Sequence, residues 1–327
     1  MTKINVSYLG MNLSSPIIVS SCGLTKSIDN LKEFESNGAG AVVLKSLFEE
    51  EIRHEVSNLV KFSGEFPYPE TEDYIRAYVS DKSTNEYLEL IKKAKSSMSI
   101  PVIASINCVT SHEWANYAKE IELAGADALE LNIFILPTSK NQTAEEIENN
   151  YVKIVTSVAK KIKIPIAVKI TQHLTNPIHT AYSMELSGAK AVVMFNRMFR
   201  PDIDIDNLLV SPGNIFSSPE EIQEIIKWIA LTYANVDIDL CATTGIQNGK
   251  TAIKVMLAGA NVVAISSILY KKGAPVIKEM NETINTWMNE KKFKNTQDFI
   301  GKLSYKNIPN PAAFERIQFM KHFSGIE

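Results

Sequence analysis

The chain has 327 residues, of which 45% are hydrophobic and 22% are charged, and its formal net charge is −3. This is the composition of an ordinary globular protein with enough apolar residues for a large core. The charge gives no excess of basic residues, so nucleic acid is not an expected partner. We also expect no membrane partner, because no stretch reaches the roughly 18 apolar residues of a membrane span and the amino terminus lacks a signal-peptide core.

The length and the cysteines indicate the organisation and the compartment. A chain of this size can form one domain if it is an α/β barrel, so we expect residues 1–327 to be a single domain. The three cysteines lie far apart in the sequence and form no CxxC pair. This spacing is typical of a reducing environment, and we expect a cytoplasmic protein.

The predicted elements begin with a short β-hairpin at residues 4–13, which is followed by eight apolar runs. Four runs repeat one pattern, in which a helix ends at a Gly-Ala pair and a strand follows. They are residues 37–46, 124–132, 187–196 and 258–267. The other four alternate with them and are residues 16–22, 101–107, 165–170 and 238–244. We expect each glycine to adopt a left-handed conformation at the helix end, and each run to be a strand buried on both faces.

Stretches with helical amphipathic spacing separate most of these strands. They cover residues 29–36, 86–96, 113–123, 144–161 and 218–231. Strands that alternate with helices pair in parallel, so eight such units predict a TIM (β/α)8 barrel whose floor the hairpin caps. The rival is an open doubly wound sheet, which more often carries a GxGxxG turn after its first strand, and none is present. Residues 48–85 predict a long loop after the second strand that covers the active face.

In TIM barrels the carboxyl ends of the strands carry the chemistry. The polar and small residues at these predicted ends are Ser21, Cys22, Gly23, Lys45, Ser46, Asn107, Cys108, Asn132, Lys169, Asn196, Thr244, Gly245, Ser266 and Ser267. A single lysine at a strand end is usually a solvated terminus. Two lysines and three asparagines at one mouth indicate a binding site instead.

The last two strands predict a phosphate site. Thr244-Gly245 and Ser266-Ser267 each place hydroxyls and backbone N–H groups just before a helix, where phosphate binds. Small hydroxyl residues at helix starts are more often plain N-caps. Their joint occurrence on strands seven and eight favours a phosphate site, because barrels frequently bind phosphate there.

On these residues, the whole chain resembles the class 1 dihydroorotate dehydrogenases, from the amino-terminal hairpin to residues 298–303. Residues 20–23, Ser-Ser-Cys-Gly, are similar to the family's Asn-Ala-Ser-Gly, which lies against the flavin. Lys45-Ser46 stands where the family has Thr-Lys-Ser. Residues 244–246 and 266–267 resemble the Gly-Gly-Ile and Gly-Thr segments that hold the FMN phosphate. No single motif is highly specific, but their order and spacing together are.

The resemblance implies an FMN-dependent oxidoreductase of pyrimidine biosynthesis that acts on a CH–CH bond and converts dihydroorotate to orotate. The residues implied to hold FMN are Ser21, Cys22, Gly23, Lys45, Ser46, Asn107, Asn132, Lys169, Asn196, Thr244, Gly245, Ser266 and Ser267. Lys45, Asn132 and Asn196 are implied to bind the small planar substrate, and Lys45 to serve catalysis. A small-molecule electron acceptor and a homodimer are also implied.

Elementary chemistry agrees with two of these roles. A cation such as Lys169 beside the flavin N1 and C2 carbonyl would stabilise the negative charge that builds up when the ring accepts a hydride. Asparagine can donate and accept at once, so Asn132 and Asn196 suit the amide edges of a pyrimidine ring.

Two departures from the family concern catalysis. Where the family has Asn-Leu-Ser-Cys-Pro-Asn, with cysteine as the base, residues 132–137 read Asn-Ile-Phe-Ile-Leu-Pro, and Ile135 occupies the base position. Isoleucine cannot accept a proton, and losing a positioned base costs roughly 10²- to 10⁴-fold in rate. The family's Asn-x-Met-Gly-x-x-Asn substrate loop is also missing at residues 65–70. Flavin binding is therefore better supported than dihydroorotate oxidation.

The catalytic base stays open. Side chains that could replace it are His54, Tyr68, Tyr74, Tyr78, Cys108 and His173. A surface or capping role is the simpler interpretation of each histidine, and a small buried filler that of Cys108. No HxxxH or carboxylate cluster predicts a metal site.

Three other functions also stay open. A reductase could run the same chemistry in the direction of ene reduction, with protonation by solvent or a loop tyrosine. A barrel could retain FMN as a structural or sensory ligand after losing the reaction, which the missing base favours. A phosphate-binding isomerase without flavin would purify as a colourless protein.

Overall fold

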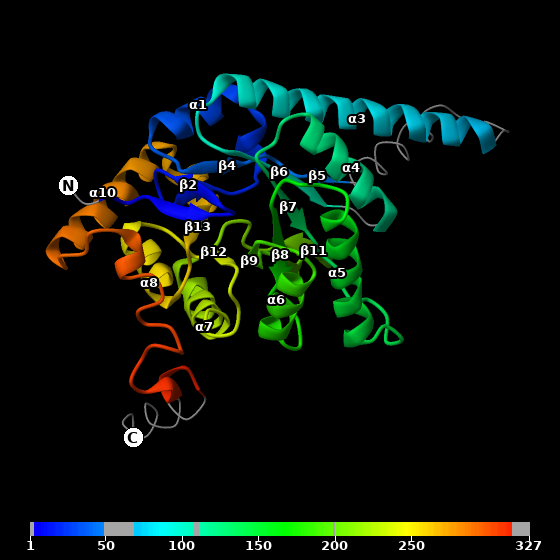
Figure 1. The fold of residues 1–327 in the computed structure, drawn as a ribbon. Coiled ribbons are helices and arrows are strands. Elements are labelled where there is room, and N and C mark those ends of the chain that lie inside the picture. Colours follow the sequence, from blue (N-terminus) through cyan, green and yellow to red (C-terminus); the bar gives the residue numbers. More distant parts are fainter. Residues whose placement is uncertain (1–2, 49–68, 108–110, 199, 316–327) are drawn as a thin grey trace.

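A closed barrel of parallel strands forms the centre of the computed structural model, which describes residues 3–48, 69–107, 111–198 and 200–315 (Figure 1). The strands follow the order β4, β3, β13, β12, β9, β8, β7 and β6, and the pairing of β4 with β6 closes the ring. They are β3 (Ile17–Val19), β4 (Ala41–Val43), β6 (Val102–Asn107), β7 (Ala128–Asn132), β8 (Ile166–Thr171), β9 (Ala191–Asn196), β12 (Asp239–Thr243) and β13 (Val262–Ile265). The predicted TIM barrel is confirmed.

Helices between the strands surround this barrel (Figure 1). They are α1 (Ile28–Ser36), α3 (Pro69–Ser97), α4 (Ser111–Leu123), α5 (Ala144–Ala159), α6 (Pro177–Leu186), α7 (Ile222–Thr232), α8 (Gly249–Ala258), α9 (Ser267–Lys272) and α10 (Pro275–Glu290). Short 3₁₀ turns are η1 (Gly23–Lys26), η2 (Pro219–Glu221), η3 (Thr296–Asp298) and η4 (Pro311–Phe314). The five predicted helices correspond to α1, α3, α4, α5 and α7.

The repeated Gly-Ala pairs behave as the sequence predicts. Gly38, Gly125, Gly188 and Gly259 all have positive φ, between 85° and 135°. Each glycine lies between the end of a helix and the next strand, and the side chains of these four strands are almost all buried. The repeat therefore marks every second strand of the barrel.

The amino-terminal hairpin pairs β1 (Val6–Tyr8) with β2 (Met11–Leu13). The Leu9 N–H donates a hydrogen bond of 2.7 Å to Asp239, the first residue of β12. Tyr8 is almost fully buried. These contacts lie at the amino ends of the strands, so the hairpin caps the barrel floor as expected.

The region after the second barrel strand differs in part from the prediction. α3 begins at Pro69 and not near residue 86, and it extends past the barrel in Figure 1. Proline followed by acidic residues at 70, 72 and 73 is typical of a helix start. The rest of the predicted long loop, residues 49–68, lies outside the described residues. A short strand, β5 (Leu47–Phe48), precedes it and pairs with β6.

A second hairpin was not predicted. β10 (Pro201–Asp204) pairs antiparallel with β11 (Leu209–Pro212), directly after the carboxyl end of β9. Its opposed residues Ile203 and Val210 are 69% and 75% exposed. The alternation of Asp and Ile from residue 202 was the available sequence signal for this strand.

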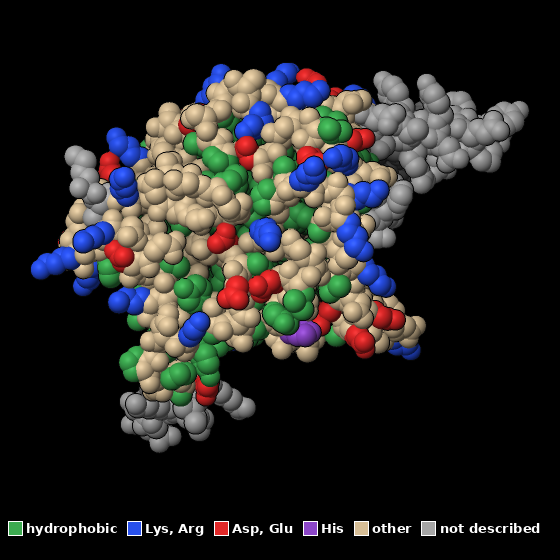
Figure 2. Space-filling model, in the orientation of Figure 1, with side chains coloured by type: hydrophobic (Ala, Val, Ile, Leu, Met, Phe, Trp, Pro, Cys, Tyr) green, Lys and Arg blue, Asp and Glu red, His purple; other side chains and the backbone are tan. Residues whose placement is uncertain are grey.

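The surface carries charges of both signs. On the face shown in Figure 2, basic and acidic side chains are interspersed and neither gathers into one large patch. Among the described helices, none is long and apolar enough to cross a bilayer.

Candidate functional site

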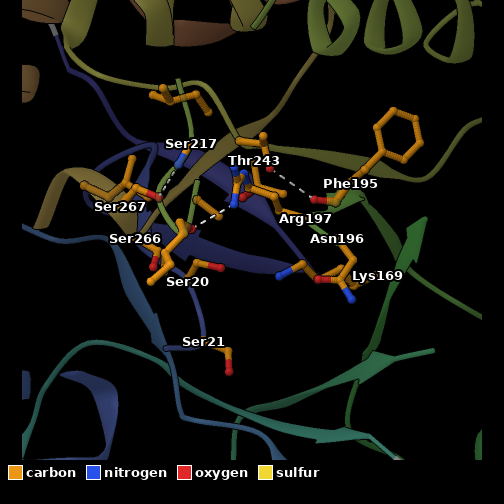
Figure 3. Close-up of a pocket in the computed structure, with 15 residues that line it drawn as sticks. Ser20, Ser21, Lys169, Phe195, Asn196, Arg197, Ser217, Thr243, Ser266 and Ser267 are labelled. Carbon is orange, nitrogen blue, oxygen red and sulfur yellow. Dashed lines mark hydrogen bonds between the residues drawn. The ribbon is translucent and has the colours of Figure 1, made fainter. Parts of the chain in front are cut away.

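A polar cavity of about 210 Å³ lies at the carboxyl ends of β3, β8, β9, β12 and β13. Six residues predicted at strand ends line it, and they are Ser21, Lys169, Asn196, Thr244, Ser266 and Ser267. Figure 3 shows Lys169 and Asn196 beside each other on one side of the cavity, and Ser20, Ser266 and Ser267 on the opposite side. One wall is therefore cationic and amide-bearing, and the other is rich in hydroxyls.

Lys169 is held on the cavity wall by its position in the sheet. It lies in the fourth position of β8, is only 8% exposed, and pairs in register with Asn132 of β7. In the described part of the chain, its ammonium group has no hydrogen bond or ion pair. A nearly buried cation that lines a cavity and makes no hydrogen bond or ion pair with the described residues suits an anionic or carbonyl-bearing ligand.

Asn132 at the end of β7 and Asn196 at the end of β9 are hydrogen-bonded to each other across the intervening strand β8. The Asn196 side-chain N–H₂ donates a 3.0 Å hydrogen bond to the Asn132 side-chain oxygen. A register shift after Ile170 aligns Asn196 with Thr171, the last residue of β8. The pair fixes the orientation of both amides and leaves the Asn132 N–H₂ and the Asn196 oxygen for a ligand.

The hydroxyl-rich wall is formed after β12 and β13. Thr244 and Gly245 both have positive φ, of 76° and 75°. A Cβ on Gly245 would lie 2.5 Å from the Ile222 backbone nitrogen, so only glycine lets this turn pack against α7. The Ser267 hydroxyl accepts a hydrogen bond of 3.1 Å from the Ser217 N–H.

Thr244-Gly245 and Ser266-Ser267 were both predicted to lie just before a helix, and this is confirmed only for Ser266-Ser267. Ser266 directly precedes α9, but α8 begins at Gly249 and is capped by the Asn248 side chain. Thr244 and Gly245 therefore lie in a turn before the helix. The reason is that Asn248 offers a better N-cap oxygen immediately before the helical run.

The remaining predicted cofactor residues do not line this cavity. Ser46 contacts it through Ser21, whose hydroxyl accepts a 2.9 Å hydrogen bond from the Ser46 N–H. Lys45 lines a neighbouring hollow beside α3, with its ammonium 4.5 Å from the centre of the Phe48 ring. Cys22 and Gly23 turn into η1, and Asn107 is buried at the end of β6.

Most candidate bases cannot be placed. His54, Tyr68 and Cys108 lie outside the described residues, and Tyr74 and Tyr78 fall on α3, where their side chains are not described. His173 follows β8 and lines a small pocket behind Asn196. Ile135 follows β7 and packs partly buried against the core. Within the described residues no group of three His, Cys, Asp or Glu side chains could hold a metal.

Two functional candidates were missed by sequence reasoning. Arg197 follows Asn196, lines the cavity, and donates hydrogen bonds of 2.8 Å to the carbonyls of Asn214 and Ile215. It thereby holds the segment that brings Ser217 to the cavity, which no sequence motif announced. Glu130 lies inside the barrel at 4% exposure. A charge in the middle of an apolar strand run was the available signal for it.

The fold and the cavity define a TIM-barrel enzyme with its site at the carboxyl face of the strands. A family model described as dihydroorotate dehydrogenase matches residues 75–288. The chain therefore belongs to the dihydroorotate dehydrogenase family, flavin-dependent oxidoreductases that act on CH–CH bonds, in agreement with the class 1 resemblance.

Three curated relatives show how far the similarity extends, and each is named dihydroorotate dehydrogenase B (NAD(+)), catalytic subunit. The Methanocella arvoryzae protein is 31% identical over 276 residues, 82% of this chain and 88% of that one. The Methanocaldococcus jannaschii protein is 28% identical over 302 residues, 89% and 94% of the two chains. The Thermoplasma volcanium protein is 26% identical over 319 residues, 92% and 98% of the two chains.

Proposed function

We propose that this protein binds FMN and oxidises dihydroorotate, or a small planar substrate of the same kind, at the cavity beside Lys169. The observation that carries the proposal is the family match combined with a nearly buried lysine on the cavity wall, Lys169. FMN would supply the hydride acceptor of the reaction.

The chemistry of the cavity fits this cofactor. Lys169 lines the cavity together with Asn196, whose amide is hydrogen-bonded to that of Asn132, and this suits the negative charge and the amide edge of a reduced flavin ring. Thr244, Ser266 and Ser267 offer hydroxyls at the other end, where a phosphate would be neutralised by hydrogen bonds. The positive φ of Gly245 keeps the backbone close to that end. Cys22, Gly23, Ser46 and Asn107 would support the flavin from behind.

The protein side chains would divide the remaining work. Lys169 would hold negative charge at the pyrimidine end of the cofactor, while Asn132 and Asn196 would orient the substrate amides. Lys45 would reach the substrate from the neighbouring hollow, where it now lies over Phe48. Removal of the substrate proton needs a base other than Ile135, because an alkyl side chain has no lone pair.

The first experiment is an anaerobic titration of the purified, FMN-loaded protein with dihydroorotate, followed by the visible absorbance of the flavin. Bleaching is expected if dihydroorotate is the substrate. A flavin that dithionite reduces and dihydroorotate does not would refute this substrate. A protein that purifies without flavin and takes up none would refute the cofactor assignment.

The Ile135 position allows a gain-of-function prediction. Ile135→Cys restores a thiol at the family's base position and is expected to raise dihydroorotate-dependent flavin reduction by roughly 10²- to 10⁴-fold. Ile135→Ala is the control, because it also shortens the side chain but adds no base. Equal rates for the two variants would show that this residue does not face the substrate.

A second function is favoured by Ile135 itself. An apolar residue at the base position suits a reaction in which the enzyme need not remove that proton, such as ene reduction with protonation by solvent. This alternative predicts that reduced flavin in the protein is reoxidised by an activated alkene and not by orotate. Reoxidation by neither would leave a flavin-binding protein without this catalysis.

We also propose a homodimer that passes electrons to a small-molecule acceptor. The β10–β11 hairpin supports it, because its paired Ile203 and Val210 expose apolar surface next to the carboxyl face. Light scattering is expected to give twice the chain mass, and Ile203→Asp with Val210→Asp to give the monomer. A monomeric wild-type protein would refute the dimer.

A further inference from the structure

A buried carboxyl group lies beneath the cavity and is not used by the proposed reaction. Glu130 is in the third position of β7, is 4% exposed, and its Oε1 atom has no hydrogen-bond partner. A buried carboxyl oxygen without a hydrogen-bond partner is energetically unfavourable. Since apolar side chains usually fill the interior layers of such barrels, the presence of Glu130 needs a physical explanation.

A chain of three serine hydroxyls connects this carboxyl group to the cavity. Ser21 lines the cavity, and its hydroxyl lies 3.1 Å from that of Ser46. The Ser46 hydroxyl lies 2.7 Å from that of Ser105, and Ser105 is the direct partner of Glu130 in the pairing of β6 with β7. Both links between serines are within hydrogen-bond distance, and each hydroxyl can both donate and accept.

Ser21, Ser46, Ser105 and Glu130 follow or lie on four strands that are neighbours in the barrel. They belong to four neighbouring strands, since Ser21 follows β3, Ser46 follows β4, and Ser105 and Glu130 are direct partners in the pairing of β6 with β7. The burial increases along the line, from the partly exposed Ser21 to Ser46 at 4% and Ser105 at 0%. Water is therefore excluded from the inner links.

The hydroxyls are held in this order by the backbone. The Ser46 N–H donates to the Ser21 hydroxyl at 2.9 Å, which leaves the Ser21 proton free to pass toward Ser46 or the cavity. The Tyr87 hydroxyl accepts from the Ser105 N–H at 2.7 Å and donates to the Ser105 carbonyl at 2.9 Å. Ser105 is thus fixed at both backbone groups, and its hydroxyl is left for the chain.

Glu130 is the group in this interior that can change charge. Burial raises its pKa, while the Lys169 cation and the Ser105 hydroxyl partly oppose that rise. The other titratable groups that face it are Tyr8, Tyr87 and Cys241, and burial raises the pKa of each far above neutrality. These three stay neutral and protonated, so the carboxyl group is the proton acceptor among them.

We propose that Ser21, Ser46 and Ser105 form a proton relay between the cavity and the Glu130 carboxyl group. One proton enters at the Ser21 hydroxyl, each serine passes its own proton to the next oxygen, and one proton arrives on Glu130. The reverse sequence returns it, and the hydroxyls end unchanged in composition. Because Lys169 faces both Glu130 and the cavity, a charge change on Glu130 is felt by whatever binds there.

The test is a pH jump on the full-length protein, with infrared detection of the protonated carboxyl group. The wild-type protein is expected to show a slow-exchanging carboxylic acid band that Glu130→Gln lacks. Ser46→Ala breaks the relay without touching Glu130 and is expected to slow the appearance of the band roughly 10²-fold or more, in the range that proton-transfer groups contribute. Ser20→Ala is the matched control, because Ser20 is a buried cavity serine outside the chain.

The outcomes separate clearly. An unchanged rate in Ser46→Ala, an equal slowing in Ser20→Ala, or a band that persists in Glu130→Gln would each overturn the relay. This experiment requires no cofactor, so its result does not depend on the proposed function.

Discussion

The structure allows an estimate of the unfolding free energy that is lost when Gly245, next to the cavity, is replaced by alanine. Gly245 has φ of 75°, where an alanine is strained by about 1–2 kcal/mol. The added Cβ would also lie 2.5 Å from the Ile222 backbone nitrogen, and backbone cannot move aside as a flexible side chain can. Forced shifts of this kind cost about 1–3 kcal/mol. We therefore expect Gly245→Ala to lose about 2–5 kcal/mol of unfolding free energy.

Gly10 provides a matched control for this prediction. It has the same φ of 75°, but nothing lies within 4 Å of the position that its Cβ would take. Gly10→Ala should therefore show the conformational strain alone, about 1–2 kcal/mol. Urea unfolding of the two variants measures the difference directly. Equal losses would refute the reasoning, because the contact with Ile222 would then cost nothing.

The same substitution should affect ligand binding at the cavity. Gly245 lies between Thr244 and Ile246, which both line it, so displacement of the turn from α7 alters the hydroxyl-rich wall. We expect Gly245→Ala to bind FMN about tenfold or more weakly, as loss of 1.4 kcal/mol or more implies. Gly10→Ala, at the barrel floor, should bind it as the wild type does. Equal FMN affinities for the two variants would contradict this.

Two further predictions concern stability. Arg197→Lys should lose about 1–3 kcal/mol of unfolding free energy and weaken FMN binding, because one ammonium cannot replace the guanidinium bonds to the carbonyls of residues 214–215. Arg200→Lys is the control, since the side chain is 51% exposed and its loss should stay within about 1 kcal/mol. Burial opposes ionisation of Glu35, but hydrogen bonds from Ser99 and the next N–H outweigh it and lower its pKa. A carboxyl group whose pKa is lower in the folded state than in the unfolded chain stabilises the fold at pH values above the unfolded pKa. This contribution is lost as the pH falls through the folded pKa. The wild type should therefore exceed Glu35→Gln in unfolding free energy by only about 0.5 kcal/mol near pH 7, and this difference should shrink toward pH 3. Urea unfolding at several pH values measures it, and a difference that stays constant with pH would contradict the reasoning.

The amino-acid sequence alone determined the barrel. Its four Gly-Ala repeats and eight apolar runs require helix ends with positive φ and strands buried on both faces, and these are local properties that survive without tertiary information. The same argument placed Lys169 and Asn196 at one mouth, because parallel strands in a barrel end on the same side. A missing base at Ile135 was also visible in the sequence, since it depends on residue type alone.

The tertiary structure decided which of these residues meet. It separated Lys45 into a neighbouring hollow and brought Arg197 and Ser217 to the cavity, because loop paths and hydrogen bonds across distant segments have no sequence period. It also joined Ser105 and Glu130, which are 25 residues apart in the chain, by the register of two strands. Register and closure set the neighbours inside a barrel, and both depend on how all eight strands fit together at once.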